Sequence, residues 1–217
     1  MSKLVGSIKQ LFGCKMRLFF GVVVIGAFSL VFGNAGVFTD SRDGQTYRTI
    51  RIGNFTWMAQ NLNFQTGNSW CYDNNENNCQ KLGRLYDWNT AMVACPADWR
   101  LPTREDWNDL VETAGGNVAG TRLKSRSPDW NGTDNFGFSA WNGTDNFGFS
   151  ALPGGRRSPN GRFFNVGDYG IWWSATELGF GIAFGSAWCR RMSSYHGRVD
   201  EFKYHESNGL SVLCLQD

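Results

Sequence analysis

The chain has 217 residues, of which 21 are basic, 19 are acidic and 41% are hydrophobic, and its formal net charge is +2. This length and apolar content suffice for one domain with a buried core and exclude a disordered chain. Residues 1–35 hold four basic and no acidic side chains, so residues 36–217 carry 17 basic and 19 acidic side chains. This balance excludes the clustered positive charge of a nucleic-acid-binding protein.

The first 35 residues have the pattern of a secretory signal peptide. Basic residues precede an uncharged run of 15 residues, Leu18–Phe32, and Gly33-Asn34-Ala35 supplies small residues for a signal peptidase. A membrane span needs about 20 residues, so the run is short for one. An uncleaved anchor and a start at Met16 are the alternatives. We expect cleavage near Ala35 and export to the periplasm, the cell surface or the medium, with no membrane span in the mature chain.

The next segment, residues 38–63, predicts a β-hairpin. Asp43-Gly44 is a turn signal, and the residues "TYRTIRI" that follow it alternate in character. Gly53-Asn54 then turns the chain into a second strand, "FTWM".

Two helices are predicted in the middle of the chain. Asp87 can cap a short helix over Trp88–Ala94, and Thr103 with Asp106 three residues later is a variant of the capping box. Gly115-Gly116 ends the second helix. Short aromatic strands and glycine turns continue from there to the C-terminus. The expected fold class is therefore α+β, with two short helices among short antiparallel strands and much irregular structure.

Five cysteines lie beyond the expected signal peptide, and in an exported protein we expect them to be oxidised where geometry permits. Cys71 and Cys79 bracket "YDNNENN", a turn-forming stretch, which favours a local hairpin closed by a disulfide. Cys95 and Cys214 could then join the middle of the chain to its end, leaving Cys189 over. Spacing alone leaves this pairing open.

Six motifs in order resemble one family. They are "FTDSRDGQTYRTIRIGNFTWMAQNLN", "SWCYDNNENNC", "GRLYDWNTAMVACPADWRLPTREDWNDLV", "FGFSALPGGRR", "WWSATE" and "SNGLSVLCLQD". Together they are similar to the Fibrobacter succinogenes major paralogous domain over residues 38–217. The resemblance implies a C-type-lectin-like fold, distantly similar to formylglycine-generating enzymes, in which the two chain ends pair. It also supports a Cys95–Cys214 disulfide, but the family name describes abundance in one genome and implies no activity.

An eleven-residue unit, "WNGTDNFGFSA", occurs twice without a difference, at 130–140 and 141–151. The family pattern contains this segment once, directly before "LPGG". We therefore expect the copy at 141–151 to fill the structural position and the copy at 130–140 to be a tandem duplicate insertion. The resulting organisation is a signal peptide over 1–35 and a single domain over 36–217. Two copies are too few for a solenoid.

Catalytic motifs are weak. The context "GSAWCRRM" around Cys189 is similar to that of formylglycine-generating oxidases, which need two cysteines for copper, but a partner is missing where Ser193-Ser194-Tyr195 stand. His196 and His205 belong to no hydrolase or metal motif. We expect that the chain is not an enzyme and has no catalytic residue. An oxidase of the formylglycine-generating type is a distant alternative.

We also expect no cofactor or metal ligand. Asp73, Asn75 and Asn77 begin like an EF-hand loop, but Asn78 stands where glycine is needed and Arg84 where glutamate is needed. A calcium site outside any motif stays an alternative.

Aromatic residues in the second half are the candidate ligand contacts. We expect at least one of a set of five to stack on a ligand, with Asn165, Asp168, Arg190 and Glu201 as polar neighbours. The five are Trp172, Trp173, Trp188, Tyr195 and Tyr204. The expected function is an exported, non-catalytic recognition domain that binds polysaccharide at the cell surface. The alternative is a structural or protein-binding module of the bacterial envelope.

Overall fold

The computed structural model describes residues 35–126, 128–131, 143–179 and 185–217. The signal peptide expected over residues 1–35 lies outside the described residues except for its last residue. No helix in the described part is long and apolar enough to cross a membrane.

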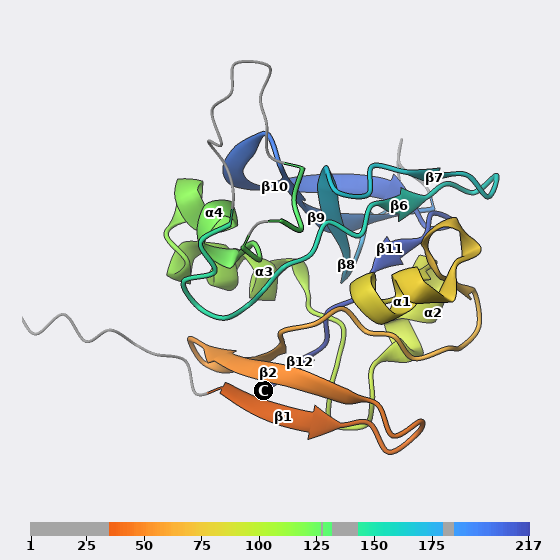
Figure 1. Cartoon of the computed structure of the whole chain (residues 1–217), viewed down its shortest axis with the longest axis horizontal. Coiled ribbons are helices and arrows are strands. Elements are labelled where there is room, and N and C mark those ends of the chain that lie inside the picture. The colour runs from red at the N-terminus through yellow and green to blue at the C-terminus, as the bar shows by residue number, and fades with distance from the viewer. Residues whose placement is uncertain (1–34, 127, 132–142, 180–184) are drawn as a thin grey trace, which may run out of the picture. The chain divides into compact units, whose positions relative to one another are not determined.

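A four-stranded antiparallel sheet contains both ends of the described chain (Figure 1), in the order β1-β2-β3-β12. Its strands are β1 (Ala35–Thr39), β2 (Thr46–Ile52), β3 (Phe55–Met58) and β12 (Leu215–Gln216). The turns fall at the predicted glycines, because Gly44 and Gly53 adopt φ values of 76° and 62°, which glycine tolerates without strain. The predicted hairpin is confirmed.

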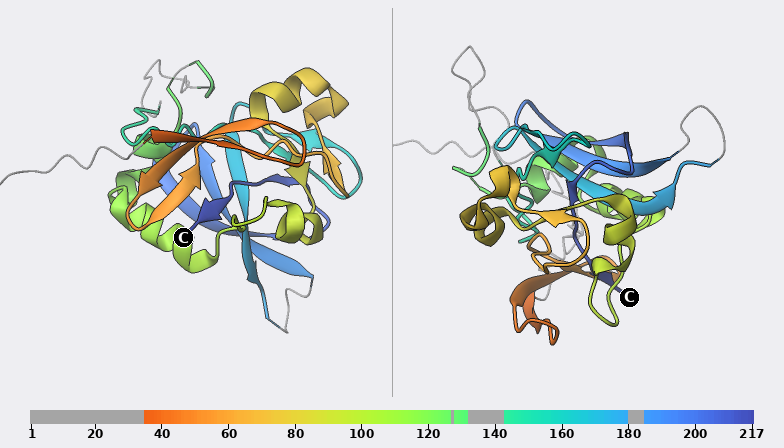
Figure 2. Two further views of the ribbon diagram at one scale, coloured as in Figure 1. Left: turned by 90° about the horizontal axis from the view of Figure 1, so that it is seen from below. Right: turned by 90° about the vertical axis from the view of Figure 1, so that its right-hand side faces the viewer.

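A six-stranded sheet has the order β10-β9-β8-β11-β5-β4. Its strands are β4 (Ser69–Trp70), β5 (Leu85–Tyr86), β8 (Tyr169–Glu177), β9 (Ser186–Ser193), β10 (His196–His205) and β11 (Leu210–Ser211). All neighbours are antiparallel except β11 and β8, which pair in parallel. The outer end of β8 and the start of β9 extend beyond the other elements in both views of Figure 2. A separate two-stranded sheet joins β6 (Arg156–Arg157) to β7 (Phe163–Phe164).

Both predicted helices are present. They are α2 (Trp88–Ala94), capped by the Asp87 side chain, and α3 (Arg104–Thr113), which has the full capping box between Thr103 and Asp106. These elements form as predicted because their caps are local in sequence. The described residues contain two further α-helices, α1 (Glu76–Leu82) and α4 (Ala119–Leu123), and two short 3-10 helices, η1 (Tyr72–Asn74) and η2 (Gly116–Val118). The α+β class is confirmed, with four α-helices where two were expected.

The Cys71–Cys79 disulfide is present, but the expected hairpin between these cysteines is wrong. The side chain of Asn75 accepts the backbone N–H of Asn77 and begins α1, which runs through Cys79. An asparagine-rich stretch is typical of turns, yet asparagine is also a good N-cap, and here the capping role prevails.

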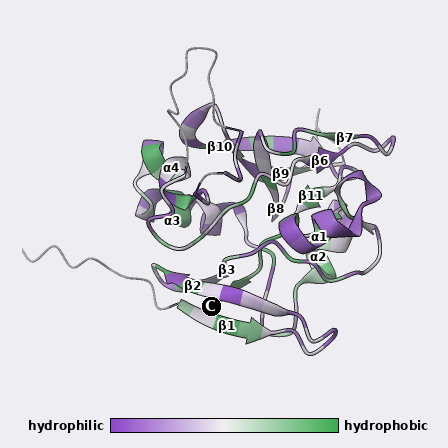
Figure 3. Ribbon diagram, viewed as in Figure 1, coloured by the Kyte–Doolittle hydropathy of each residue, from purple (hydrophilic) through white to green (hydrophobic). Residues whose placement is uncertain are grey.

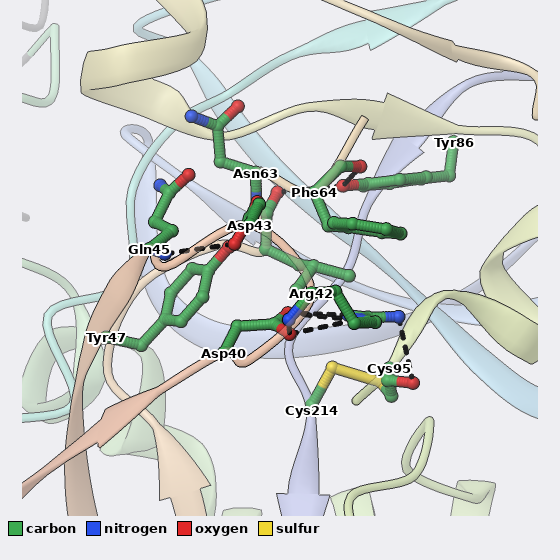
Figure 4. A network of polar contacts seen from close by, with 11 residues as sticks. Asp40, Arg42, Asp43, Gln45, Tyr47, Asn63, Phe64, Tyr86, Cys95 and Cys214 are labelled. Carbon is green, nitrogen blue, oxygen red and sulfur yellow. Dashed lines mark hydrogen bonds and ion pairs between the residues drawn. A yellow bond between two sulfur atoms is a disulfide. The ribbon is translucent and has the colours of Figure 1, made fainter. Parts of the chain in front are cut away.

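The second disulfide, Cys95–Cys214, joins the end of α2 to the residue before β12. Figure 4 shows the polar network beside it. Asp40, 0% exposed, accepts hydrogen bonds from Arg42, whose guanidinium lies 3.8 Å from the centre of the Phe64 ring and donates to the backbone oxygen of Cys95. The turn after β1 is therefore fastened to the elements around this disulfide.

The core lies between the two sheets and α3, and it is built from indole rings. Trp107 of α3 lies 5.1 Å from Trp57 of β3 and 6.1 Å from Trp172 of β8, centre to centre. Phe149, from the second copy of the repeat, lies 5.7 Å from Trp57. These contacts join both sheets and the segment before β6 into one core.

The repeat contributes to this core from both copies. Trp130 opens the first copy, is 3% exposed and donates from Nε1 to the backbone oxygen of Ala151 in the second. Phe149 and Ala151 are buried, as expected for the second copy, while residues 132–142 lie outside the described residues. Trp130, the first residue of the expected insertion, is therefore part of the core, and the insertion of 130–140 stays a prediction.

Candidate functional site

The structure places Trp172 and Trp173 inside the fold, which corrects their prediction as ligand contacts. Both are 0% exposed. Trp172 donates from Nε1 to Oδ1 of Asn61, and Trp173 donates from Nε1 to the backbone oxygen of Tyr86. Their strand β8 lies inside the six-stranded sheet, and both faces of the sheet are covered there. Trp172 and Trp173 point to opposite faces, so neither side chain reaches solvent.

Trp188 lies on the side of β9 that faces α3, where its ring is half-buried and 4.6 Å from the Arg104 guanidinium. The predicted polar neighbours Arg190 and Glu201 are engaged on the same side. Arg104 binds both carboxylate oxygens of Glu201, and Arg190 lies 3.1 Å from that carboxylate and donates to Asn108. Hydrogen bonding to Arg104 lowers the pKa of Glu201. These residues fasten the β9–β10 hairpin to α3.

The opposite side of the β9–β10 hairpin carries the exposed ring of Phe202 among partly buried aromatic rings. Phe202, 39% exposed, lies 5.4 Å from the Tyr204 ring. The Arg191 guanidinium lies 4.6 Å from the centre of the Phe202 ring and 5.1 Å from that of Tyr169. Asp200 on the next strand accepts from Arg191 at 3.1 Å and fixes this arginine between the two rings.

The β6–β7 hairpin extends this surface. The Arg156 guanidinium lies 4.7 Å from the ring centre of Phe164 and 5.4 Å from that of Tyr204. The contact with Tyr204 joins the two hairpins, which are distant in sequence. In Figure 3 the two strands contrast, with the arginine strand β6 in purple and the phenylalanine strand β7 in green.

Tyr195 completes the surface at the turn between β9 and β10. It is 56% exposed, and its ring lies 6.0 Å from that of Tyr169. Partial burial and the negative charge of Asp168 raise its pKa. Lys124, 0% exposed, donates from Nζ to the backbone oxygens of Ser193 and His196 and holds the turn in place.

We call this surface the arginine–aromatic face. It comprises Arg156, Phe164, Tyr169, Arg191, Tyr195, Phe202 and Tyr204. The contacts run without a break from Phe164 through the two arginines to Tyr195. Three of its rings are among the exposed large hydrophobic side chains of the described residues.

Groups that could act as nucleophiles near this face are constrained. Cys189 lies opposite Phe202 on β9 and is 1% exposed, and burial raises the pKa of its thiol, which disfavours the reactive thiolate. In His196, Nδ1 accepts from the backbone N–H of Arg198, and Nε2 lies 3.2 Å from the Asp200 carboxylate. With both nitrogens engaged, this imidazole has no position left to activate Ser193 or Ser194.

The metal candidates lie elsewhere. Within the described residues, one group of three potential ligand side chains is close enough to hold an ion, namely Cys71, Glu76 and Cys79. Its two sulfur atoms form a disulfide, so the group does not suit a metal. Of the calcium-like positions, Asp73 lies in η1 and Asn75 caps α1.

Two clefts lie away from the arginine–aromatic face. One, of about 310 Å³, lies between the β2–β3 turn and α3 and includes Phe55, Asp109 and Glu112. The other, of about 350 Å³, is mainly apolar and lies beside β1 and β2, including Val37 and Ile50. Neither cleft contains a residue of the arginine–aromatic face.

Of the five predicted aromatic contacts, only Tyr195 and Tyr204 belong to this face. Sequence reasoning missed Phe202, although its position two residues before Tyr204 on one strand places both rings on the same side. It also missed Phe164 and Arg156, for which no local pattern exists, because Arg156 contacts Tyr204 across 48 residues of sequence and links Phe164 to it.

Comparison with known proteins gives one match. Residues 50–216 match the sequence model of the Fibrobacter succinogenes major domain. No curated protein and no solved structure matches the chain. The C-type-lectin-like fold implied by the resemblance therefore stays a prediction.

Proposed function

We propose that this chain, which belongs to the Fibrobacter succinogenes major domain family, works as an exported, non-catalytic recognition domain for a protein partner. The partner binds at the arginine–aromatic face.

The observation that carries the proposal is the composition of that face. Arginine, tyrosine and phenylalanine are enriched in protein–protein interfaces, and tyrosine and arginine supply many of their strongest contacts. Here the arginines are already held between rings, at 4.6 Å and 5.1 Å for Arg191. Because this order exists before binding, less conformational entropy is lost when a partner docks.

The same contacts argue for protein over polysaccharide. A sugar ring stacks on an open aromatic face, whereas guanidinium groups lie over Tyr169, Phe202, Phe164 and Tyr204. Polysaccharide binding was expected from five aromatic residues, of which Trp172 and Trp173 are buried, while Trp188 and Tyr204 lie against guanidinium groups. Tyr195 remains as an open ring for a sugar, so polysaccharide binding stays a prediction and is an outcome of the test below.

Two further features support an exported, non-catalytic role. The disulfides Cys71–Cys79 and Cys95–Cys214 suit an oxidising compartment outside the cytoplasm. Cys189 is buried and has no second free cysteine beside it among the described residues, which argues against the formylglycine-generating oxidation, because that reaction needs a pair of accessible cysteines.

The test is co-purification from the envelope of the encoding bacterium, with the full chain as bait. The face variant is Tyr195→Ser/Phe202→Ser, and the matched control is Met92→Ser/Val93→Ser, which changes two exposed hydrophobic residues on α2. We expect the same protein with the wild-type chain and the control, and on the order of tenfold less with the face variant.

In parallel, the full chain is applied to a panel of soluble and insoluble polysaccharides with and without a chelator. The protein partner would be replaced by a sugar ligand if the chain is retained saturably on a polysaccharide and no co-purified protein depends on the residues changed in the face variant. Loss of that retention with chelator would restore the calcium alternative.

A further inference from the structure

We infer that the partner presents an acidic, extended polypeptide segment to the β6–β7 hairpin, where Arg156 and Arg162 bind its carboxylates. This inference rests on the proposed function and specifies the chemistry of the partner.

The first observation is a segment of one-sided charge. Residues 146–167 contain three arginines, Arg156, Arg157 and Arg162, and no acidic residue. Beyond residue 35 the chain has more acidic than basic side chains, so this segment stands out as a local positive region. A local field of this kind attracts an oppositely charged partner.

The second observation is that these three arginines, like Arg48, Arg51, Arg122, Arg126 and Arg198, lie outside the salt bridges of the described residues. Six arginines form salt bridges with carboxylates, namely Arg42, Arg84, Arg100, Arg104, Arg190 and Arg191. In the part of the chain that the structure describes, none of the three hairpin arginines does so. Their charge is therefore available to carboxylates from outside.

Arg156 belongs to the arginine–aromatic face, and we infer that Arg162 lies beside it. Arg156 is held between Phe164 and Tyr204, and its one side-chain hydrogen bond, to Oδ1 of Asn208, is long at 3.4 Å. Arg162, the exposed residue before β7, accepts the backbone N–H of Ser158, so the hairpin pairing continues to it. Alternation along an extended segment would place its side chain on the side of Phe164. Arg157 lies on the other side, 4.0 Å from the Trp70 ring centre.

The backbone beside these arginines favours a polypeptide. Strand β7 pairs with β6 and, among the described strands, with no other, so its outer edge offers unpaired backbone groups. An extended peptide can add to such an edge through main-chain hydrogen bonds while its alternate side chains meet the neighbouring surface. An acidic peptide would place its carboxylates beside Arg156 and Arg162. Acidic polysaccharides lack this main-chain pairing.

The test uses fluorescently labelled poly-L-glutamate, with polygalacturonate as the acidic polysaccharide probe, and follows anisotropy with the full chain. The variants are Arg156→Gln, Arg162→Gln and the double variant, and the control is Arg51→Gln, which removes one positive charge from an exposed position on β2. All variants are checked for folding by circular dichroism.

We expect saturable binding of poly-L-glutamate that weakens about tenfold between 50 and 300 mM salt, as screening predicts for exposed charges. The double variant should lose on the order of tenfold in affinity and Arg51→Gln no more than about twofold. Equal losses for the control and the hairpin variants, or preference for polygalacturonate, would overturn the acidic peptide.

Co-purification separates this inference from the function on which it rests. If the envelope partner binds Arg156→Gln/Arg162→Gln as well as the wild-type chain but not Tyr195→Ser/Phe202→Ser, the acidic segment is wrong and the protein partner stands. If it binds neither variant, both hold. If no protein binds the wild-type chain, the proposed function itself fails.

Discussion

Some aromatic side chains in this protein are buried in the core and others are exposed to solvent. Trp172 and Phe202 show this difference. Trp172 is enclosed and bonded to Asn61, whereas Phe202 on the same sheet is 39% exposed. Both are aromatic residues in predicted strands, so their residue types alone do not separate them. Their neighbours do, because β8 lies inside the sheet and β10 at its edge.

Trp172→Phe is expected to destabilise the protein by about 1–3 kcal/mol, because it leaves the buried Oδ1 of Asn61 without a donor. Phe202→Ser should change the free energy of unfolding by no more than about 1 kcal/mol, because the Phe202 ring that it removes is partly exposed to solvent. Urea denaturation followed by circular dichroism measures both. A smaller loss for Trp172→Phe than for Phe202→Ser would contradict this assignment.

Asp40 makes stability depend on pH. Hydrogen bonding to Arg42 lowers the pKa of its carboxyl group below the ordinary value. The pKa of Asp40 is lower in the folded chain than in the unfolded chain. The interaction therefore stabilises the protein fully at pH values above the pKa of the unfolded chain, and this stabilisation is lost as the pH falls through the pKa of the folded chain. We expect the stability gap between the wild-type chain and Asp40→Asn to be full at pH 7 and to close below about pH 4. Thermal unfolding across that range measures it, and a gap independent of pH would be inconsistent with the pair.

At the scale of elements, local signals were sufficient where a cap or turn decides the structure. Asp87 and Thr103 begin α2 and α3 as predicted, and glycines turn β1 into β2 and β2 into β3. The α1 helix was missed because Asn75 has equal standing as a turn residue and as a cap. The surface formed by Arg156 and Tyr204 was beyond prediction, since it depends on how two distant hairpins pack.

The repeat gives a test at this scale. Deleting residues 132–142 leaves one complete unit, with Trp130-Asn131 joined to Gly143, and loop closure depends only weakly on length. We expect this deletion to shift the melting temperature by no more than a few degrees.

In the deleted chain, Trp130→Ala should cost about 3–5 kcal/mol, as for a buried tryptophan. In the full chain the cost should be smaller, because Trp141-Asn142 has the same sequence, precedes Gly143 directly and can take the place of Trp130-Asn131. Trp107→Ala is the control and should cost the same in both chains. Equal costs for Trp130→Ala in both chains would refute this exchange.

At the scale of the whole molecule, the family and the α+β class could be predicted because the motifs cover nearly all of the domain. The composition of the candidate face could be predicted only in part. Tyr195 and Tyr204 were found from the aromatic content of the C-terminal half, while Trp172 and Trp173 were misplaced because strand order within a sheet is not local information. Residues on one surface here come from β6, β7, β8, β9 and β10, and only the fold brings them together.

The most direct test of the protein-partner account is photo-crosslinking in living cells of the encoding bacterium, with p-benzoylphenylalanine placed at Phe202 and, as the control, at Val93. Val93 is 77% exposed on α2, outside the arginine–aromatic face. We predict a discrete protein adduct from position 202, absent from position 93 and reduced by Arg156→Gln/Arg162→Gln. Equal labelling from both positions, or no protein adduct from position 202 while the chain is exported and folded, would contradict a partner bound at this face.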